Sequence, residues 1–335
     1  MELINFEDLH DRLPEKRIKL SEEKLEKMLA EIEKQTEIIS SNTAKENKAL
    51  AHFERGNAKY SIGLFKEALS DYGRAIELRS DFAVAFNNRG RAKDLLGMLE
   101  EAILDFDEAI RIKPDYILAY ICRGTAKVTR GAFGDAVKDF DEAIRIKPDC
   151  AEAYFNRGLA KEMQGMLEEA IPDFDEAIRI KPDCAEAYFA RGVAKAKKSS
   201  LGDAVKDFDE AIRIKPDYAN AYANRGLAKE MQGMLDDSIK DYNATILLKP
   251  DDTEAHYNRG VIKHRQGRLG DAIKDYCRAI ELKPDFAEAY YNRGIAKKDA
   301  GKYIDAILDF QECLCLGKYV ANANAQIGIC KQNLG

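Results

Sequence analysis

The sequence predicts an all-α solenoid of eight helical hairpins, and three observations support this prediction. First, six of the eight prolines recur every 34 residues, and a fixed period of this length is typical of stacked repeats. Second, in register with these prolines, one position is always glycine and another is always Phe or Tyr. Third, the small and aromatic residues of each unit fall at helical spacing on two segments, which predicts two helices per unit. The six prolines are Pro114, Pro148, Pro182, Pro216, Pro250 and Pro284.

Placing each of these prolines in position 32 divides most of the chain into eight units, and we call the 34 positions of a unit its columns. The sequence therefore predicts an N-terminal helical extension at 1–42, a repeat domain at 43–320 and a C-terminal capping helix at 321–335. The eight units are 49–82, 83–116, 117–150, 151–184, 185–218, 219–252, 253–286 and 287–320.

Columns 8, 20 and 24 indicate how the two helices of a unit pack. Column 8 is always glycine and column 20 is alanine except for Ser238, so neither helix carries bulk at these points. We expect the helices to approach closely there, with the ring of column 24 filling the remaining space. The glycines are Gly56, Gly90, Gly124, Gly158, Gly192, Gly226, Gly260 and Gly294. The rings are Tyr72, Phe106, Phe140, Phe174, Phe208, Tyr242, Tyr276 and Phe310.

Three charged columns are equally regular. Column 7 is always arginine, column 11 is always lysine and column 23 is always aspartate. The two basic columns are one helical turn apart and fall between the small and the aromatic columns, so they face the packing seam. We interpret the three columns as an interhelical salt-bridge network, because partly buried charges need partners. A basic ladder for phosphates is the disfavoured alternative. The acidic pairs of columns 25 and 26, such as Asp107 and Glu108, are interpreted as a solvated helix face.

This pattern resembles the tetratricopeptide repeat (TPR) family over residues 49–320. Column 4 carries Tyr, Phe or His where the family usually has Trp, and columns 7 and 11 carry charges where it usually has Leu and Tyr. The resemblance implies a right-handed superhelix of helix-turn-helix repeats whose first helices line a concave groove. It also implies a non-catalytic scaffold or adaptor that binds an extended or helical segment of a partner protein in that groove.

The resemblance implies that columns 2, 5, 6, 9, 12 and 13 of the first helices point into this groove. Column 6 is asparagine in five units, and a row of amides can hold a peptide backbone because each amide is both donor and acceptor. Columns 5 and 9 add apolar anchors. The alternative is that these residues only support helix packing. The predicted binding residues are Asn88, Asn156, Asn224, Asn258, Asn292, Phe155, Phe189, Tyr257, Tyr291, Leu159 and Leu227.

The same columns predict the character of the partner. Column 2 is glutamate in four units and column 12 is acidic in three, which favours a protein or peptide that is neutral or basic with apolar anchors. The carboxylate clamp of some TPR domains is disfavoured. Asn57 and Asn88 match the asparagines of that clamp. Phe53, Leu118 and Cys122 occupy positions where the clamp has cations.

Composition argues against several other classes of protein. Charged residues make up 33% of the chain, and no apolar run approaches the roughly 18 residues of a membrane span, so no membrane association is expected. The formal charge of -6 disfavours nucleic acid as the main partner. No nucleophile elbow, P-loop, dinucleotide fingerprint or HExxH pattern occurs, so we expect no enzyme, catalytic residue, metal site or cofactor. The N-terminus lacks a signal-peptide pattern and the seven cysteines lack framework spacing, which predicts a cytoplasmic protein.

Residues 1–42 leave alternatives open. Their pattern predicts a helix at about 20–39 with a single apolar stripe. This helix could cover the exposed end of the solenoid, dimerise with its copy, or lie in the groove. The corresponding alternatives for function are a self-assembling structural scaffold that forms homo-oligomers through residues 1–42, or a regulatory subunit of a larger complex.

Overall fold

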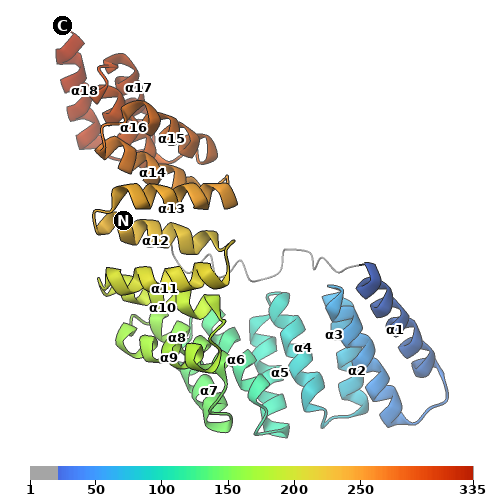
Figure 1. The fold of residues 1–335 in the computed structure, drawn as a ribbon. Coiled ribbons are helices and arrows are strands. Elements are labelled where there is room, and N and C mark those ends of the chain that lie inside the picture. Colours follow the sequence, from blue (N-terminus) through green and yellow to red (C-terminus); the bar gives the residue numbers. More distant parts are fainter. Residues whose placement is uncertain (1–21, 335) are drawn as a thin grey trace. The chain divides into compact units, whose positions relative to one another are not determined.

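The computed structural model describes residues 22–334, and within that range it contains eighteen α-helices and no strand (Figure 1). Helix α1 (Glu22–Ser40) is the helix predicted at about 20–39, and the remainder of the predicted extension, residues 1–21, lies outside the described range. The other helices alternate as the first and second helices of hairpins, so the predicted all-α helical-repeat class is confirmed. The first helices are α2 (Lys45–Ser61), α4 (Ala83–Leu95), α6 (Ile117–Thr129), α8 (Ala151–Met163), α10 (Ala185–Lys197), α12 (Ala219–Met231), α14 (Thr253–Arg265), α16 (Ala287–Asp299) and α18 (Val320–Leu334). The second helices are α3 (Phe65–Leu78), α5 (Leu99–Ile112), α7 (Phe133–Ile146), α9 (Leu167–Ile180), α11 (Leu201–Ile214), α13 (Leu235–Leu248), α15 (Leu269–Leu282) and α17 (Tyr303–Cys315).

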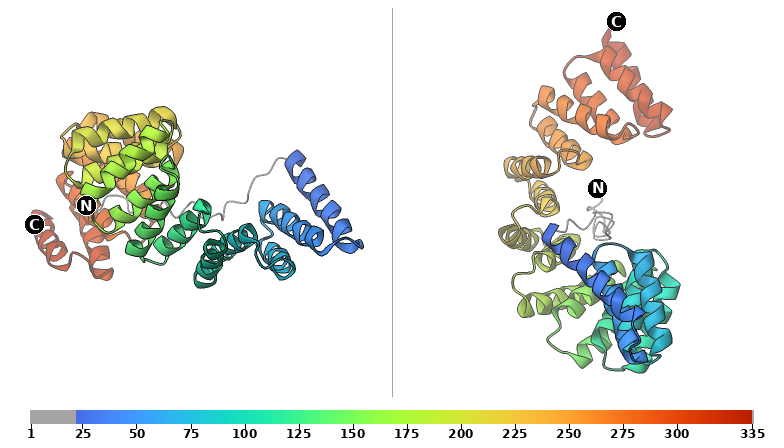
Figure 2. Two further views of the ribbon diagram at one scale, coloured as in Figure 1. Left: turned by 90° about the horizontal axis from the view of Figure 1, so that it is seen from below. Right: turned by 90° about the vertical axis from the view of Figure 1, so that its right-hand side faces the viewer.

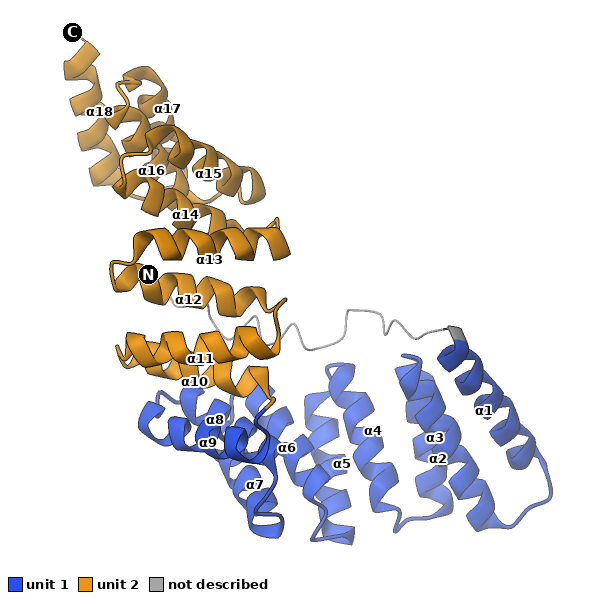
Figure 3. Ribbon diagram, in the orientation of Figure 1, with its two compact units in different colours: residues 1–182 blue, residues 183–335 orange. Residues whose placement is uncertain are grey.

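The chain divides into two compact units, residues 1–182 and 183–335, and each is described by itself (Figure 3). Unit one contains α1 to α9 and unit two contains α10 to α18. Within each unit every first helix except the last, α18, packs against its own second helix, and that second helix packs against the next first helix of the unit (Figure 2). The core of each unit is therefore distributed between neighbouring hairpins, as is typical of repeat proteins.

The turn inside each hairpin depends on column 15, where the backbone adopts positive φ. The value is +76° at Gly97 and +81° at Gly131, a conformation that glycine reaches without steric cost. In the hairpin of α10 and α11 this column holds Ser199, which adopts a φ of 62°. The repeated glycine thus ends each first helix and reverses the chain toward the second.

The predicted close approach of the two helices at column 8 is confirmed. A Cβ atom placed on Gly158 would lie 2.7 Å from Cε1 of Phe174, so only glycine leaves room for the ring. The column-20 position on the facing helix is equally tight, since Ala136 and Ala170 are fully buried. Ser238, the exception in this column, is buried as well and donates a hydrogen bond to the carbonyl oxygen of Gly226 at 2.7 Å.

The predicted salt-bridge network is also confirmed and is present in all eight hairpins. In each one, Nη2 of the column-7 arginine lies 2.5 to 2.7 Å from Oδ1 of the column-23 aspartate. Nζ of the column-11 lysine lies 2.7 to 2.9 Å from Oδ2 of the same aspartate. The aspartates are only 2 to 5% exposed, so each buried carboxylate receives two cations from the facing helix. In six of the hairpins the arginine also lies over the column-4 ring, as Arg123 does over Tyr120 at 5.4 Å from its centroid.

One sequence interpretation was incomplete: the column-25 residues are not simply a solvated face. Asp107 accepts a hydrogen bond at 2.5 Å from Nη1 of Arg123, which belongs to the next hairpin. Arg157 contacts Asp141 in the same way, and in unit two Arg259 donates to Asn243. Each of these arginines therefore joins its own hairpin to the preceding one.

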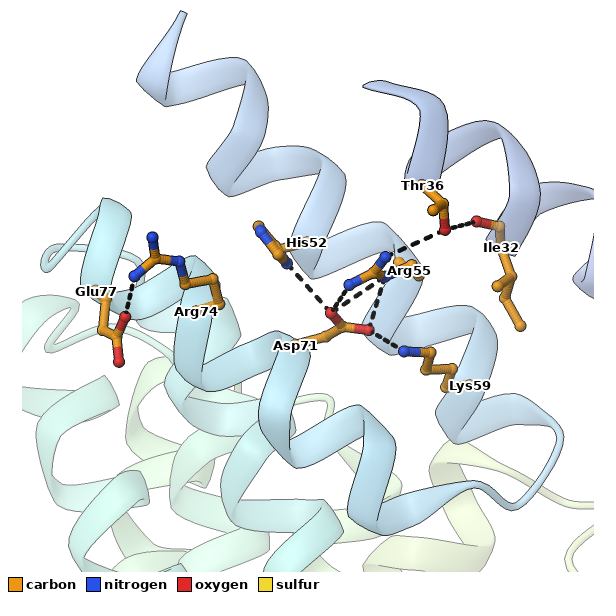
Figure 4. A network of polar contacts seen from close by, with 8 residues as sticks. All are labelled: Ile32, Thr36, His52, Arg55, Lys59, Asp71, Arg74 and Glu77. Carbon is orange, nitrogen blue, oxygen red and sulfur yellow. Dashed lines mark hydrogen bonds and ion pairs between the residues drawn. The ribbon is translucent and has the colours of Figure 1, made fainter. Parts of the chain in front are cut away.

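Helix α1 takes the place of a preceding second helix beside the first hairpin. It packs against α2, and Nη1 of Arg55 donates to Oγ1 of Thr36 at 3.1 Å (Figure 4). Asp71 accepts from His52, Arg55 and Lys59 (Figure 4). Burial by itself raises the pKa of Asp71, but the hydrogen bonds from Arg55, Lys59 and His52 outweigh it and leave the pKa below its ordinary value.

The Asp139→Asn substitution is expected to destabilise the protein by about 3 kcal/mol, because it leaves the partly buried Arg123 and Lys127 without their shared countercharge. Urea unfolding followed by circular dichroism measures the change. The matched control is Asp135→Asn, which removes an exposed ion pair with Lys138 and is expected to leave stability nearly unchanged. Equal effects of the two substitutions would contradict a structural role for column 23.

The Gly158→Ala substitution is expected to cost about 1 to 3 kcal/mol, because the new methyl group overlaps the ring of Phe174. Adding Phe174→Leu should recover part of that loss, which a double-mutant cycle of thermal unfolding detects as coupling. Gly134→Ala is the control, since a Cβ there meets no atom within 4 Å and should leave stability unchanged or slightly raised. Additive effects at positions 158 and 174 would count against the close-approach model.

Candidate protein-binding surface

Within each unit, most neighbouring first helices contact one another directly. In unit one α2 touches α4, α4 touches α6 and α6 touches α8; in unit two α10 touches α12, α14 touches α16 and α16 touches α18. Among the described helices, no two second helices approach each other to a comparable extent. The first helices therefore form the inner, more closely spaced side of each unit, and their outward side chains form one continuous surface there.

The column-5 rings lie on this surface but also belong to the core. Tyr257 packs its ring 5.9 Å from that of Tyr276 and 4.9 Å from that of Phe286. Burial raises the pKa of the Tyr257 hydroxyl to about 12. Tyr291 and Phe155 are half-buried in the same manner, whereas Phe189 is buried between two rings. The half-buried rings keep one edge available to a ligand.

The column-9 residues differ in the same way. Leu159 in unit one is half-buried, whereas Leu227 in unit two is only 6% exposed. Leu227 therefore contributes to helix packing in this structure, and Leu159 presents apolar surface.

The column-6 asparagines are not an independent row of free amides. Asn88 donates from Nδ2 to Oδ1 of Asn57 at 2.9 Å, and Asn292 donates to the hydroxyl of Tyr257 at 2.6 Å. Both hydrogen bonds reach back to the preceding first helix. Asn156 and Asn258 are half-buried. The amides of Asn88 and Asn292 thus link neighbouring hairpins and keep part of their surface open.

Asn224 differs from the other column-6 asparagines. It is 1% exposed and donates to the carbonyl oxygen of Asn220 on its own helix. Its Oδ1 has no hydrogen-bond partner among the described residues. In this structure its amide is therefore buried away from any ligand.

The acids of column 12 are more buried than a groove lining requires. In unit two Glu230 is 6% exposed, and its Oε1 lies 2.9 Å from Nη1 of Arg265. Burial raises the pKa of Glu230, and the positive charge of the nearby Arg265 opposes that rise. Burial also raises the pKa of Asp94 in unit one. These acids therefore contribute less negative charge to the surface than their number in the sequence indicates.

The structure adds a pocket that the sequence did not single out. It has a volume of about 290 Å³ and lies between α2, α3 and α4 of unit one. Asn57 and Asn88 are there, as the comparison with the carboxylate clamp anticipated, but Arg91 and Tyr60 were missed. A charged residue in column 9, which is otherwise mostly apolar, was the available signal for Arg91. The lining residues are Asn57, Tyr60, Ser61, Tyr72, Asn88 and Arg91.

Stacked helical hairpins with one continuous surface of first helices define the class of helical-repeat scaffolds. Family models described as TPR repeat match residues 196–233, 231–267 and 262–301, and one described as tetratricopeptide repeat matches 53–117 and 123–183. The chain therefore belongs to the tetratricopeptide repeat family. This family is in general a non-catalytic protein-interaction fold, and no enzyme family matches. No curated protein sequence matches the chain.

Several solved structures are similar to this chain. YrrB, described as a TPR protein with an unusual peptide-binding site, is 29% identical over 57% of this chain and 96% of YrrB, with a TM-score of 0.47. MamA from Desulfovibrio magneticus RS-1 is 19% identical over 51% of this chain and 97% of that one, with a TM-score of 0.48. A tetratricopeptide repeat protein from Parabacteroides merdae ATCC 43184 is 20% identical over 74% of this chain and 98% of that one, with a TM-score of 0.54. The last comparison supports the fold class.

The described residues also bear on membrane insertion. None of the helices from α1 to α18 combines the length and the apolar character needed to cross a bilayer.

Proposed function

We propose that this protein is a non-catalytic scaffold that holds an extended or helical segment of a partner protein against the first helices of its units. The observation that carries this proposal is the direct contact between successive first helices, which places columns 5, 6 and 9 of neighbouring hairpins on one surface. Apolar rings and amides alternate along that surface, and this combination suits a polypeptide ligand.

The charged seam supports a protein partner over a nucleic acid. The column-7 arginines carry the regular positive charge of the chain, and a phosphate backbone would need them free. Arg293, for example, has a side chain that is 15% exposed and is bound to Asp309 at 2.7 Å. Because the repeated arginine and lysine of each hairpin are both bound to a buried carboxylate, they are not free to bind phosphates.

Unit two supplies the clearest peptide-binding features. The half-buried rings of Tyr257 and Tyr291 come from consecutive hairpins, and the amide of Asn292 lies beside the first of them. Two exposed or half-exposed acids, Glu254 and Glu288, stand in column 2 of the same two helices. This arrangement favours a partner segment that has apolar side chains as anchors and is neutral or basic where it contacts unit two.

Replacing the half-exposed asparagines of column 6 tests the proposed binding surface. The partner is first captured from the native host on the immobilised full-length chain and identified by mass spectrometry, and its affinity is then measured by calorimetry. Replacing Asn156 and Asn258 by alanine should weaken binding by about tenfold, since each amide hydrogen bond contributes about 0.5 to 1.5 kcal/mol. The melting temperature should stay nearly unchanged, because both side chains are half-buried at the surface.

Asn324→Ala, on an exposed position of α18, is the matched control and should leave affinity unchanged. A parallel loss of affinity and of melting temperature in the double variant would mean that the column-6 amides serve helix packing alone. Unchanged affinity in that variant would place the binding surface elsewhere on the molecule.

A further inference from the structure

One arginine of the charged seam lacks a contact that most of its counterparts make. Six of the eight column-7 arginines donate from Nη1 to a side chain of the preceding helix, and the acceptors are Thr36, Asp107, Asp141, Asp209, Asn243 and Cys277. For Arg89 on α4 the matching position on α3 is Gly73, and Nη1 of Arg89 has no acceptor among the described residues. Its side chain is accordingly the most exposed of the eight, at 24% against 15 to 18% for the others.

The guanidinium of Arg89 is nevertheless held in the same pose as in the other hairpins. Its Nε lies 2.8 Å from Oδ2 of Asp105 and its Nη2 lies 2.6 Å from Oδ1, while the group lies 5.4 Å from the ring centroid of Phe86. Because a guanidinium is planar and rigid, these contacts also fix the direction of the Nη1 donors. In the next two hairpins of unit one the same pose directs Nη1 to Asp107 and Asp141. Arg89 therefore presents a donor whose direction is set before any acceptor arrives.

The position in front of this donor is open. Gly73 lies in the middle of α3, where glycine weakens a helix. Unlike the column-8 glycines it is not required by a close approach, because a Cβ atom there would meet no atom within 4 Å. Asp107 and Asp141, which hold the corresponding position in later hairpins, have half-exposed side chains, so the position can be reached from solvent.

The charges at this junction do not balance as they do in the next hairpins. At the Asp107 junction the arginine and the lysine of the seam meet two carboxylates, so these four groups are neutral together. At the Gly73 junction the arginine and the lysine meet only Asp105, and one positive charge remains. Glu77, one turn further along α3, is bound by Arg74 and does not supply the missing charge. The junction is therefore complementary to one carboxylate from outside the chain.

We propose that the open position at Gly73 binds the carboxylate of an acidic side chain of a partner protein, which accepts hydrogen bonds from Nη1 of Arg89. The bound carboxylate takes the place that Asp107 and Asp141 have in the next hairpins. Column 7 is two positions from columns 5 and 9, or about 200° around the helix, so Arg89 points away from the inner surface of the first helices. The inference therefore goes beyond the proposed function and gives unit one a second contact surface.

The side chain of Arg89 reports on this site by nitrogen-15 NMR of the full-length protein. Every column-7 arginine donates from Nε to its own aspartate, which slows exchange of that hydrogen with water, so eight Nε–H signals are expected. The signal that disappears in Arg89→Lys identifies Arg89. Glutamate capped as N-acetyl and methylamide is titrated at constant ionic strength, with equally capped glutamine as the uncharged control. Capped glutamate should shift the Arg89 signal in a saturable manner and leave the other seven in place.

Two substitutions close and open the site. Gly73→Asp supplies the carboxylate from within the chain, so it should weaken the binding of capped glutamate at Arg89 by at least tenfold. Its melting temperature should exceed that of Gly73→Ala, which is the matched control for removing a glycine from a helix. Asp141→Ala removes the acceptor from a later junction and should make the Arg157 signal respond to capped glutamate.

No shift at Arg89, an equal shift with capped glutamine, or a response that persists in Gly73→Asp would overturn the proposal. Stronger binding of inorganic phosphate than of capped glutamate would reject a carboxylate as the ligand. A melting temperature of Gly73→Asp below that of Gly73→Ala would show that position 73 does not face Arg89. Loss of partner binding on replacing Asn156 and Asn258 concerns the inner surface alone, so the two proposals fail independently.

Discussion

The buried column-23 aspartate is the constraint on which the rest of this structure depends. A lone carboxylate removed from water is strongly unfavourable, so each aspartate requires the arginine and lysine that reach it from the facing helix. Both cations must come from the same face of the first helix, one turn apart, which fixes the rotation of that helix relative to the second. The contact at Asp139, with Arg123 at 2.6 Å and Lys127 at 2.8 Å, satisfies this requirement. Because Arg123 also binds Asp107 of the preceding hairpin, the same group helps to set the spacing between hairpins.

This arrangement explains why the inner surface of each unit can vary without changing the fold. The seam holds the regular charges, and the glycine and ring of columns 8 and 24 set the distance between helices. Columns 5, 6 and 9 are not part of the charged seam or of the close approach at column 8, although column-5 rings such as Tyr257 pack against the column-24 ring. Those positions can therefore carry an amide, a ring or a cation, as Asn88, Tyr257 and Arg91 do, while the hairpin geometry stays the same. Columns 5, 6 and 9 also contribute to packing, as the buried side chains of Phe189, Asn224 and Leu227 do, but their residue types are not fixed.

The sequence predicted most of the hairpin, because the interactions inside it connect residues a fixed number of positions apart. The ion pairs of Asp139 with Arg123 and Lys127 follow from the repeat length and from the rotation per residue of an α-helix. The surface was less predictable, because it depends on how successive first helices meet. Identical stretches RGLAKEMQGML at 157–167 and 225–235 are each preceded by an asparagine, yet Asn156 is half-buried and Asn224 is buried.

The residues beside those two asparagines account for part of that difference. Phe155 precedes the first and Ala223 the second, so the space around the two amides is not the same. The hydrogen bond from Asn88 to Asn57 likewise connects two hairpins, so the sequence of a single repeat does not predict it.

Column 9 is the position of the inner surface at which the residue type changes most between hairpins. It holds Asn57, Arg91, Thr125, Leu159, Val193, Leu227, Val261 and Ile295. Columns 7, 8, 11 and 23 are invariant across the same eight hairpins, so a repeat that tolerates no change in its seam has accepted a single cation in column 9. Arg91 reaches back to the preceding hairpin, since its guanidinium lies 5.3 Å from the ring centroid of Tyr60 on α2. One position of the first helix therefore varies with the contact that it makes to the preceding hairpin, while the seam stays constant.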